Sequence, residues 1–123
     1  MARNLNTSLK KDKTSSQSVI LKNMRKEIVT RFLDTLVLAK LKKAGSLNGY
    51  EALRFIHNKY DLMISAGTIY SVFYSLERKG LIKGKVIGNK REYTLTERGL
   101  ETIETILNYQ KEIHNYLALC IIE

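Results

Sequence analysis

The stretch ISAGTIYSVFYSLERKGLIKGKVIGNKREYTLTERGLETI, residues 64–103, decides the fold of this chain. Ser65 can cap the start of a helix and Gly80 is the residue type that ends one, so we expect a helix over residues 66–79. Apolar residues recur along it at helical spacing and share one face, namely Ile69, Val72, Phe73 and Leu76. The pattern predicts a helix that is buried on that face.

The opposite face of this helix has an unusual composition. It carries small hydroxyls, two tyrosines and one arginine, namely Thr68, Tyr70, Ser71, Tyr74, Ser75 and Arg78. Exposed helices usually carry Glu and Lys. Small hydroxyl side chains instead let a helix approach a groove closely and hydrogen-bond to phosphates or bases. A helix buried on both sides is the alternative, and Arg78 and the serines argue against it.

A two-stranded hairpin is expected after this helix. Its strands cover residues 81–87 and 91–95, and Gly88-Asn89 between them suits a tight turn. In the second strand Tyr93 and Leu95 alternate with polar residues, which predicts one buried face.

Two helices are expected on the N-terminal side of this stretch. The first has a wide apolar stripe and runs from about Val19 or Asn23 to Ala44. The second begins at Asn48, which forms a capping box with Glu51.

Three smaller features complete this part of the chain. We expect Tyr50, Leu53, Ile56 and His57 or Tyr60 to share one face of the second helix, and residues 62–64 to form a short strand. Residues 1–18 are polar and rich in Ser, Thr, Asn and Lys, which predicts a flexible basic tail that we expect to extend to residue 22.

A last helix is expected from Glu97, capped by Thr96, to about Ile121. About 24 helical residues would extend about 36 Å, which is longer than the preceding elements can cover. The surplus apolar stripe therefore predicts a dimer, with packing against the first helix of the same chain as the alternative. The residues expected in the dimer interface are Phe32, Leu36, Leu100, Ile103, Leu107, Ile113, Leu117 and Ile121.

We therefore expect the chain to divide into a tail (1–22), a DNA-binding domain (23–95) and a dimerisation helix (96–123).

The charge of the chain indicates a polyanionic partner. It has 123 residues, enough for one domain, with 21 Lys and Arg against 12 Asp and Glu. The net charge of +9 divides into +8 over residues 1–45, +4 over 46–95 and −3 over 96–123. Six cations and no acid occur from Arg78 to Arg91. A stretch whose charged residues are all positive favours nucleic-acid binding, so double-stranded DNA is the expected partner.

Several other classes of protein do not fit this sequence. Two histidines, one cysteine and scattered carboxylates supply no catalytic set and no metal site, so we expect neither an enzyme nor a cofactor. Gly80, Gly84 and Gly88 match no phosphate-binding fingerprint. There is no apolar run of 18 residues and no N-terminal apolar signal, which favours a cytoplasmic protein without a membrane segment.

Four motifs in order resemble the PadR family of transcriptional regulators. They are Gly49-Tyr50-Glu51, Gly67-Thr68-Ile69-Tyr70, the segment from Leu76 to Ile82 (LERKGLI), and the segment from Tyr93 to Gly99 (YTLTERG). The resemblance covers about residues 46–103. It departs from the family at Ser71, where the family usually has proline, and in the single C-terminal helix, which is typical of the short members.

The resemblance implies an α+β, mostly α fold: a winged helix-turn-helix with a long C-terminal dimerisation helix. It also implies a homodimeric, sequence-specific DNA-binding regulator, expected to be a repressor, acting on a palindromic site. Some family members respond to small aromatic ligands. This chain has no tryptophan to stack a flat ligand, so the sequence gives little support for an effector.

The expected DNA contacts come from the 66–79 helix with its cap and from the hairpin. They are Ser65, Thr68, Tyr70, Ser71, Tyr74 and Arg78, followed by Lys85, Asn89, Lys90 and Arg91. Two alternatives remain open from the residues: a sequence-tolerant architectural DNA-binding protein, and a winged helix that binds an acidic protein partner.

Overall fold

The computed structural model describes residues 15–122, which divide along the chain into two units between Phe32 and Leu33. The first unit contains α2 (Ser15–Arg31), which carries an ion pair of 2.8 Å between Glu27 and Arg31. Residues 15–22 belong to the flexible tail that the sequence predicts. That assignment is wrong for these residues because they are helical, and the rest of the expected tail lies outside the described residues.

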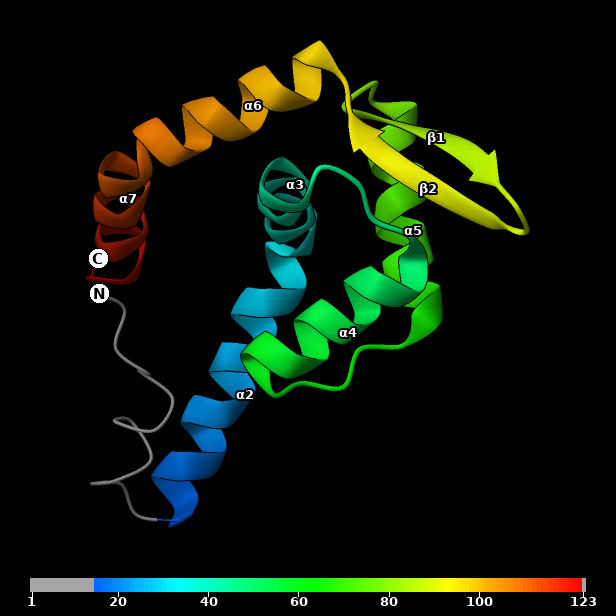
Figure 1. Ribbon diagram of the computed structural model, residues 1–123. Coiled ribbons are helices and arrows are strands. Elements are labelled where there is room, and N and C mark those ends of the chain that lie inside the picture. The colour runs from blue at the N-terminus through cyan, green and yellow to red at the C-terminus, as the bar shows by residue number, and fades with distance from the viewer. Residues whose placement is uncertain (1–14, 123) are drawn as a thin grey trace. The chain divides into compact units, whose positions relative to one another are not determined.

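The second unit is mostly helical with one small antiparallel sheet, which is a winged-helix fold (Figure 1). Its elements are α3 (Leu33–Ala44), α4 (Gly49–Tyr60), α5 (Ala66–Arg78), β1 (Ile82–Ile87), β2 (Lys90–Leu95), α6 (Glu97–Asn108) and α7 (Gln110–Ile122). Helix α3 contacts α5, α6 and β2, and α5 contacts α4 and β1. The hairpin of β1 and β2, called the wing below, projects beyond α5 (Figure 1).

Apolar side chains from α3, α5 and α6 form the core of this unit. Leu33, Val37 and Leu41 of α3 are buried, as are Ile69 and other apolar residues of α5. Against them the Phe73 ring of α5 stacks on the Tyr93 ring of β2, with centroids 4.3 Å apart and planes 9° apart. Stacked aromatic pairs of this kind contribute about 0.5–1.5 kcal/mol beyond their buried area. The expected apolar face of α5 is therefore confirmed.

The beginning of α4 agrees with the expected capping box. The Asn48 side chain accepts from the Glu51 N–H (2.8 Å), and the Glu51 carboxylate accepts from the Asn48 N–H (2.9 Å). The buried face of α4 differs from the expectation, because Tyr50 is exposed and Ala52 is buried beside Ile56. Helix α4 repeats every 3.6 residues, which turns Tyr50 away from Ala52 and Ile56.

The strand expected at residues 62–64 is wrong. These residues form no strand, and Asp61 before them adopts the left-handed conformation that ends α4 (φ 54°). The third strand-like segment is at Leu47, whose N–H and carbonyl exchange hydrogen bonds with Tyr93 at 3.1 and 2.8 Å. An isolated pair of this kind has no alternating pattern to reveal it in the sequence.

The wing agrees with the expected hairpin. Its register pairs Ile87 with Lys90 across the two-residue turn Gly88-Asn89. Gly88 has φ 66°, a conformation that glycine adopts without steric cost. Glycine at the first turn position suits the right-handed twist of the two strands.

Thr96 joins the end of α5, the wing and α6. Its hydroxyl donates to the Gly80 carbonyl (2.6 Å) and accepts from the Gly99 N–H (3.0 Å), which caps α6 as expected. Its own N–H donates to the Leu81 carbonyl (3.1 Å). The backbone at Gly99 packs so closely on Leu81 that a Cβ there would overlap the Leu81 carbonyl oxygen. Only glycine fits this junction without a backbone shift.

The expected single C-terminal helix is wrong, because Tyr109 separates α6 from α7. Tyr109 has φ −111° and ψ 21°, and the Gln110 side chain donates to the Leu107 carbonyl (3.0 Å). A side chain that takes up a helix carbonyl in this way competes with the backbone ladder. The expected continuous first helix is likewise interrupted, at Phe32.

The apolar residues of the C-terminal segment have two different environments. Ile103 is fully buried in its own chain, so its expected place in a dimer interface is wrong. By contrast Leu100, Leu107, Ile113 and Leu117 are each exposed by 40–42%. Helix α7 has no buried residue. Among residues 15–122, no helix is long and apolar enough to span a membrane.

We predict that Gly99→Ala lowers the free energy of unfolding by about 1–3 kcal/mol, because the added methyl group forces the α6 backbone away from Leu81. Urea unfolding followed by circular dichroism measures this loss. Gly67→Ala is the matched control: its nearest neighbour would be Ser65 Oγ at 3.9 Å, and alanine favours helix. Equal destabilisation by both substitutions would contradict the close contact at Gly99.

Candidate nucleic-acid interface

The outer face of α5 is exposed, as the sequence predicted. Tyr74 is exposed by 64% and Tyr70 by 54%, and Ser71 and Arg78 are exposed with them. The Arg78 guanidinium lies 5.6 Å from the centroid of the Tyr74 ring. A cation over an aromatic ring is held in place by electrostatic attraction. This pair presents a planar donor group and an aromatic surface at the C-terminal half of α5.

The two hydroxyls expected to contact DNA at the start of α5 also form its cap. Ser65 Oγ accepts from the Thr68 N–H at 3.1 Å and lies 2.9 Å from Thr68 Oγ1. Each hydroxyl oxygen has two lone pairs and one proton, so the cap leaves bonding capacity at both. The cap therefore fixes the position of these hydroxyls and does not exclude a contact with phosphate.

Tyr70 connects the two helices of the helix-turn-helix. Its ring covers Gly49 at the start of α4 so closely that a Cβ at Gly49 would lie 2.5 Å from Tyr70 Cε1. Gly49 and Tyr70 belong to two of the motifs quoted above, and their contact explains why a glycine precedes Tyr50. Half of the Tyr70 side chain still faces solvent. Tyr70 therefore serves the packing of α4 on α5 as well as the exposed surface.

The wing presents Lys85, Asn89 and Lys90, which the sequence predicts as DNA contacts, as exposed side chains. Arg91 is different because its guanidinium turns toward α5. It lies 5.6 Å from the Tyr93 ring centroid and donates from Nη2 to the Glu77 carboxylate at 2.6 Å. This hydrogen bond raises the pKa of Arg91 above its usual value.

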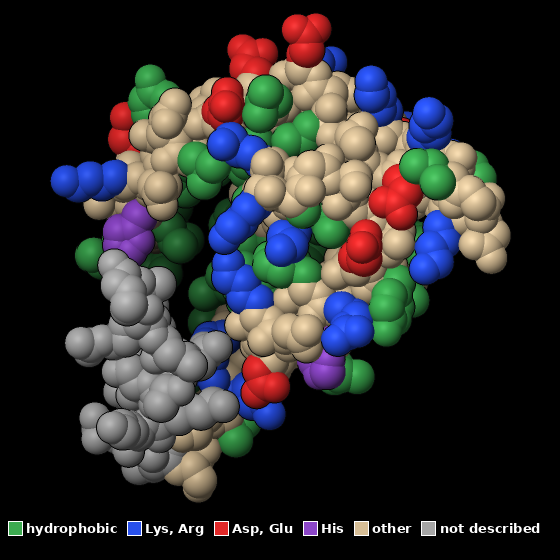
Figure 2. All heavy atoms as spheres, in the orientation of Figure 1, with side chains coloured by type: hydrophobic (Ala, Val, Ile, Leu, Met, Phe, Trp, Pro, Cys, Tyr) green, Lys and Arg blue, Asp and Glu red, His purple; other side chains and the backbone are tan. Residues whose placement is uncertain are grey.

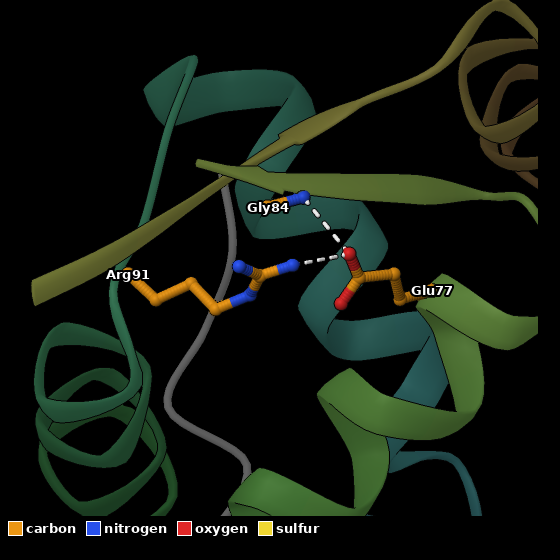
Figure 3. Close-up of polar contacts among 3 residues, drawn as sticks. All are labelled: Glu77, Gly84 and Arg91. Atoms are coloured by element: carbon orange, nitrogen blue, oxygen red, sulfur yellow. Dashed lines mark hydrogen bonds and ion pairs between the residues drawn. The ribbon is translucent and has the colours of Figure 1, made fainter. Parts of the chain in front are cut away.

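Glu77 makes two contacts with the wing (Figure 3). Its carboxylate oxygen Oε2 accepts from Arg91 and also from the Gly84 N–H at 3.3 Å. The two side chains of the ion pair are 33% and 44% exposed, and such surface pairs contribute about 0.2–1 kcal/mol. The pair therefore fixes the position of the wing more than it stabilises the fold.

Sequence reasoning missed two features of this surface. Glu77 immediately precedes the cationic stretch that begins at Arg78, and the spacing of α5 and the hairpin could not show that the two meet. Tyr50 and Arg54 form an exposed pair on α4, with the guanidinium 5.8 Å from the ring centroid. Their spacing of four residues in a helix is a signal that could have found them.

The charged side chains are unevenly distributed over the second unit. In the view of Figure 2, acidic side chains gather over α6 and the start of α7, while Lys and Arg side chains lie mainly over the other elements.

An open groove of about 770 Å³ lies beside α4, lined by Lys40, Ser46, Leu47, Glu51, Phe55, Lys59 and neighbours. The ammonium groups of Lys40 and Lys59 lie 5.0 and 5.6 Å from the Phe55 ring centroid.

The fold and the exposed basic surface define a winged-helix DNA-binding protein. The family model for the transcriptional regulator PadR-like family matches residues 37–105, more than half of the chain. The chain therefore belongs to the PadR-like family of transcriptional regulators. It is a DNA-binding transcriptional regulator and not an enzyme.

Solved structures agree with this assignment. A transcriptional regulator from Clostridium thermocellum is 26% identical, with a TM-score of 0.63 over 79% of this chain and 96% of that chain. The PadR of Bacillus subtilis, solved in complex with operator DNA, is 25% identical, with a TM-score of 0.53 over 63% of this chain and 46% of that chain. A PadR family regulator from Clostridium difficile is 22% identical and shares the fold (TM-score 0.64, 73% of this chain, 98% of that chain). The comparison with curated proteins gave no match.

Proposed function

We propose that this protein represses transcription as a homodimer that binds a palindromic DNA site, with α5 in the major groove and the wing on the phosphate backbone. The observation that carries the proposal is the exposed face of α5 with its hydroxyls, tyrosines and Arg78, beside a wing that carries Lys85 and Lys90. The similar PadR of Bacillus subtilis was solved with operator DNA, which supports the same use of the fold here.

The roles of the predicted residues differ within this proposal. The major groove and the DNA backbone beside it are contacted by Ser65, Thr68, Ser71 and Tyr74. Tyr70 adds the exposed half of its ring to this surface. Arg78 is the one cation on the exposed face of α5 itself, and it is the side chain that can bond a guanine with two N–H groups. Lys85, Asn89 and Lys90 contact phosphate from the wing, while Arg91 holds the wing through Glu77.

Selection from a library of randomised 30-base-pair duplexes tests this function. We expect a palindromic sequence whose half-sites are about one helical turn, ~34 Å, apart. Fluorescence anisotropy then compares the selected duplex with a shuffled duplex of the same composition, and we expect a preference of about 10³ or more. Equal, steeply salt-dependent binding to both duplexes would instead favour an architectural DNA-binding protein. No binding at about 50 mM salt would favour an acidic protein partner.

We predict that Lys90→Ala reduces the slope of log affinity against log salt concentration by about 1 per half-site, or ~2 per dimer, because one phosphate contact is lost in each half. Anisotropy titrations at four or more salt concentrations measure the slope. Lys43→Ala in the last turn of α3 removes the same charge at an exposed position outside the proposed DNA and dimer contacts and is the control. An unchanged slope in Lys90→Ala would remove the wing from the proposed interface.

The exposed apolar residues of the C-terminal segment support the dimer. Leu100, Leu107, Ile113, Leu117 and Ile121 are exposed, at 40–77%. Apolar side chains that recur along a helix and are not covered by the described residues 15–122 fit a second copy. In the first unit α2 exposes Ile20, Met24 and Ile28 as well, and Phe32 follows them. We propose dimerisation through α7, the exposed face of α6, the exposed residues of α2 up to Phe32, and the half-buried Leu36.

The charges of these segments are complementary. Between them α6 and α7 contain four Glu, one Arg and one Lys, whereas α2 contains four cations and one Glu. Contact between α2 of one protomer and the C-terminal segment of its partner would pair opposite charges around an apolar seam. Electrostatic complementarity of this kind favours one orientation of the partner over others.

We predict that the double substitution Leu107→Glu with Leu117→Glu yields monomers in sedimentation velocity, because two carboxylates per chain would be buried without partners at the interface. Asn108→Glu with Asn115→Glu adds the same charge at polar, exposed positions and is expected to leave the dimer intact. Dimers that persist in the Leu107/Leu117 protein would show that this segment is not the interface.

A further inference from the structure

One carboxylate lies on the side of α5 that faces the wing, in a region otherwise rich in cations. Glu77 is followed at once by Arg78 and Lys79, and the wing adds further Lys and Arg side chains. A negative charge beside a phosphate-binding surface weakens attraction to DNA. Its presence in this place therefore calls for a role that outweighs the repulsion.

The backbone of the wing leaves a position for this carboxylate. Tyr93 directs both its N–H and its carbonyl to Leu47, so its pairing with Gly84 in β1 is the kind without hydrogen bonds between the two residues. The Gly84 N–H consequently points away from β2, and Glu77 accepts from it at 3.3 Å. The carboxylate of α5 thus bonds to the free edge of β1.

The side chain of Arg91 reaches the same carboxylate across Gly84. Arg91 lies on the same face of β2 as Tyr93, two residues away, and Gly84 on the neighbouring strand has no side chain in its path. A Cβ at Gly84 would collide with the guanidinium of Arg91. One carboxylate oxygen therefore binds both strands of the wing, β1 through Gly84 and β2 through Arg91 (Figure 3).

We propose that Glu77 is a positioning residue for DNA recognition: it holds the wing at a fixed distance from α5, so that both reach one half-site together. Arg91 acts with Glu77 and not as a phosphate contact. The inference rests on the proposed function, because it assigns the wing and α5 to the same DNA site. It differs from a stability role, since an exposed ion pair of this kind contributes little to folding.

The test compares Glu77→Ala, Glu77→Gln and the control Asp61→Asn, which removes an equal charge from an exposed position at the end of α4 and keeps a residue type that tolerates the left-handed conformation there. Glutamine keeps an oxygen that can accept from Gly84, whereas alanine removes both contacts. We expect Glu77→Ala to lower the preference for the selected duplex over the shuffled one about tenfold, the size of one misplaced base contact. Glu77→Gln should recover part of that loss, and the melting temperature should fall by less than about 5 °C.

A pure charge effect gives a different result. In that case Glu77→Ala and Glu77→Gln would bind both duplexes more tightly by the same factor, the preference would stay unchanged, and the proposal would be overturned. A double-mutant cycle with Arg91→Gln adds a second criterion. If Glu77 acts through Arg91, the Glu77→Ala effect on preference is smaller in the Arg91→Gln background, and additive effects would contradict the proposal.

A measurement without DNA separates this inference from the proposed function. NMR amide exchange and ¹⁵N relaxation report on the wing of the free protein. We expect the Gly84 amide to exchange faster, and the wing amides to become more mobile, in Glu77→Ala but not in Asp61→Asn. An unchanged wing would overturn the inference even if DNA preference is present. A wild-type protein without DNA preference would overturn the proposed function, while the NMR result would still decide whether Glu77 holds the wing.

Discussion

The structure depends on the interactions of Tyr93. Its ring stacks on Phe73 of α5 with centroids 4.3 Å apart, and its backbone exchanges two hydrogen bonds with Leu47. It is also the partner of Gly84 in the register of the wing. One residue thus joins α5, the loop before α4 and the hairpin. Because Phe73 is held inward by this stack, its neighbour Tyr74 is turned outward, and the exposed face of α5 is defined.

Stability and placement are supplied by different interactions. The buried apolar side chains of α3, α5 and α6 stabilise the unit, since each fully buried large residue contributes about 1.5–3 kcal/mol. The polar contacts at the edges are weaker, but they determine where the surface elements lie. Asn48 bonds to Glu92 of β2 at 3.3 Å, Thr96 ties the end of α5 to α6, and Glu77 ties α5 to the wing. In the proposed interface α5 and the wing meet one half-site together, and such contacts would hold the two elements in place for it.

Local patterns predicted the elements whose ends are set by nearby residues. The Ser65, Asn48 and Thr96 caps each bond to a backbone N–H three residues later, so short spacing in the sequence was enough to find them. Periodicity likewise identified the apolar face of α5. The breaks at Phe32 and Tyr109 involve neither glycine nor proline, and periodicity continues across them. The pairing of Leu47 with Tyr93 joins residues 46 positions apart, and no local pattern can show it.

The sequence by itself determined the winged-helix class, the order from α5 through the hairpin to α6, the family and the composition of the face that α5 exposes, because these follow from caps, spacing and side-chain chemistry along the chain. Only the tertiary structure decided which of those side chains are available. It buried Ile103 in its own unit, placed Tyr70 over Gly49, and turned Arg91 from the surface of the wing to Glu77. Each of these outcomes depends on a contact between segments that are distant in the sequence. The distance between the contacting side chains is fixed only when the whole unit packs.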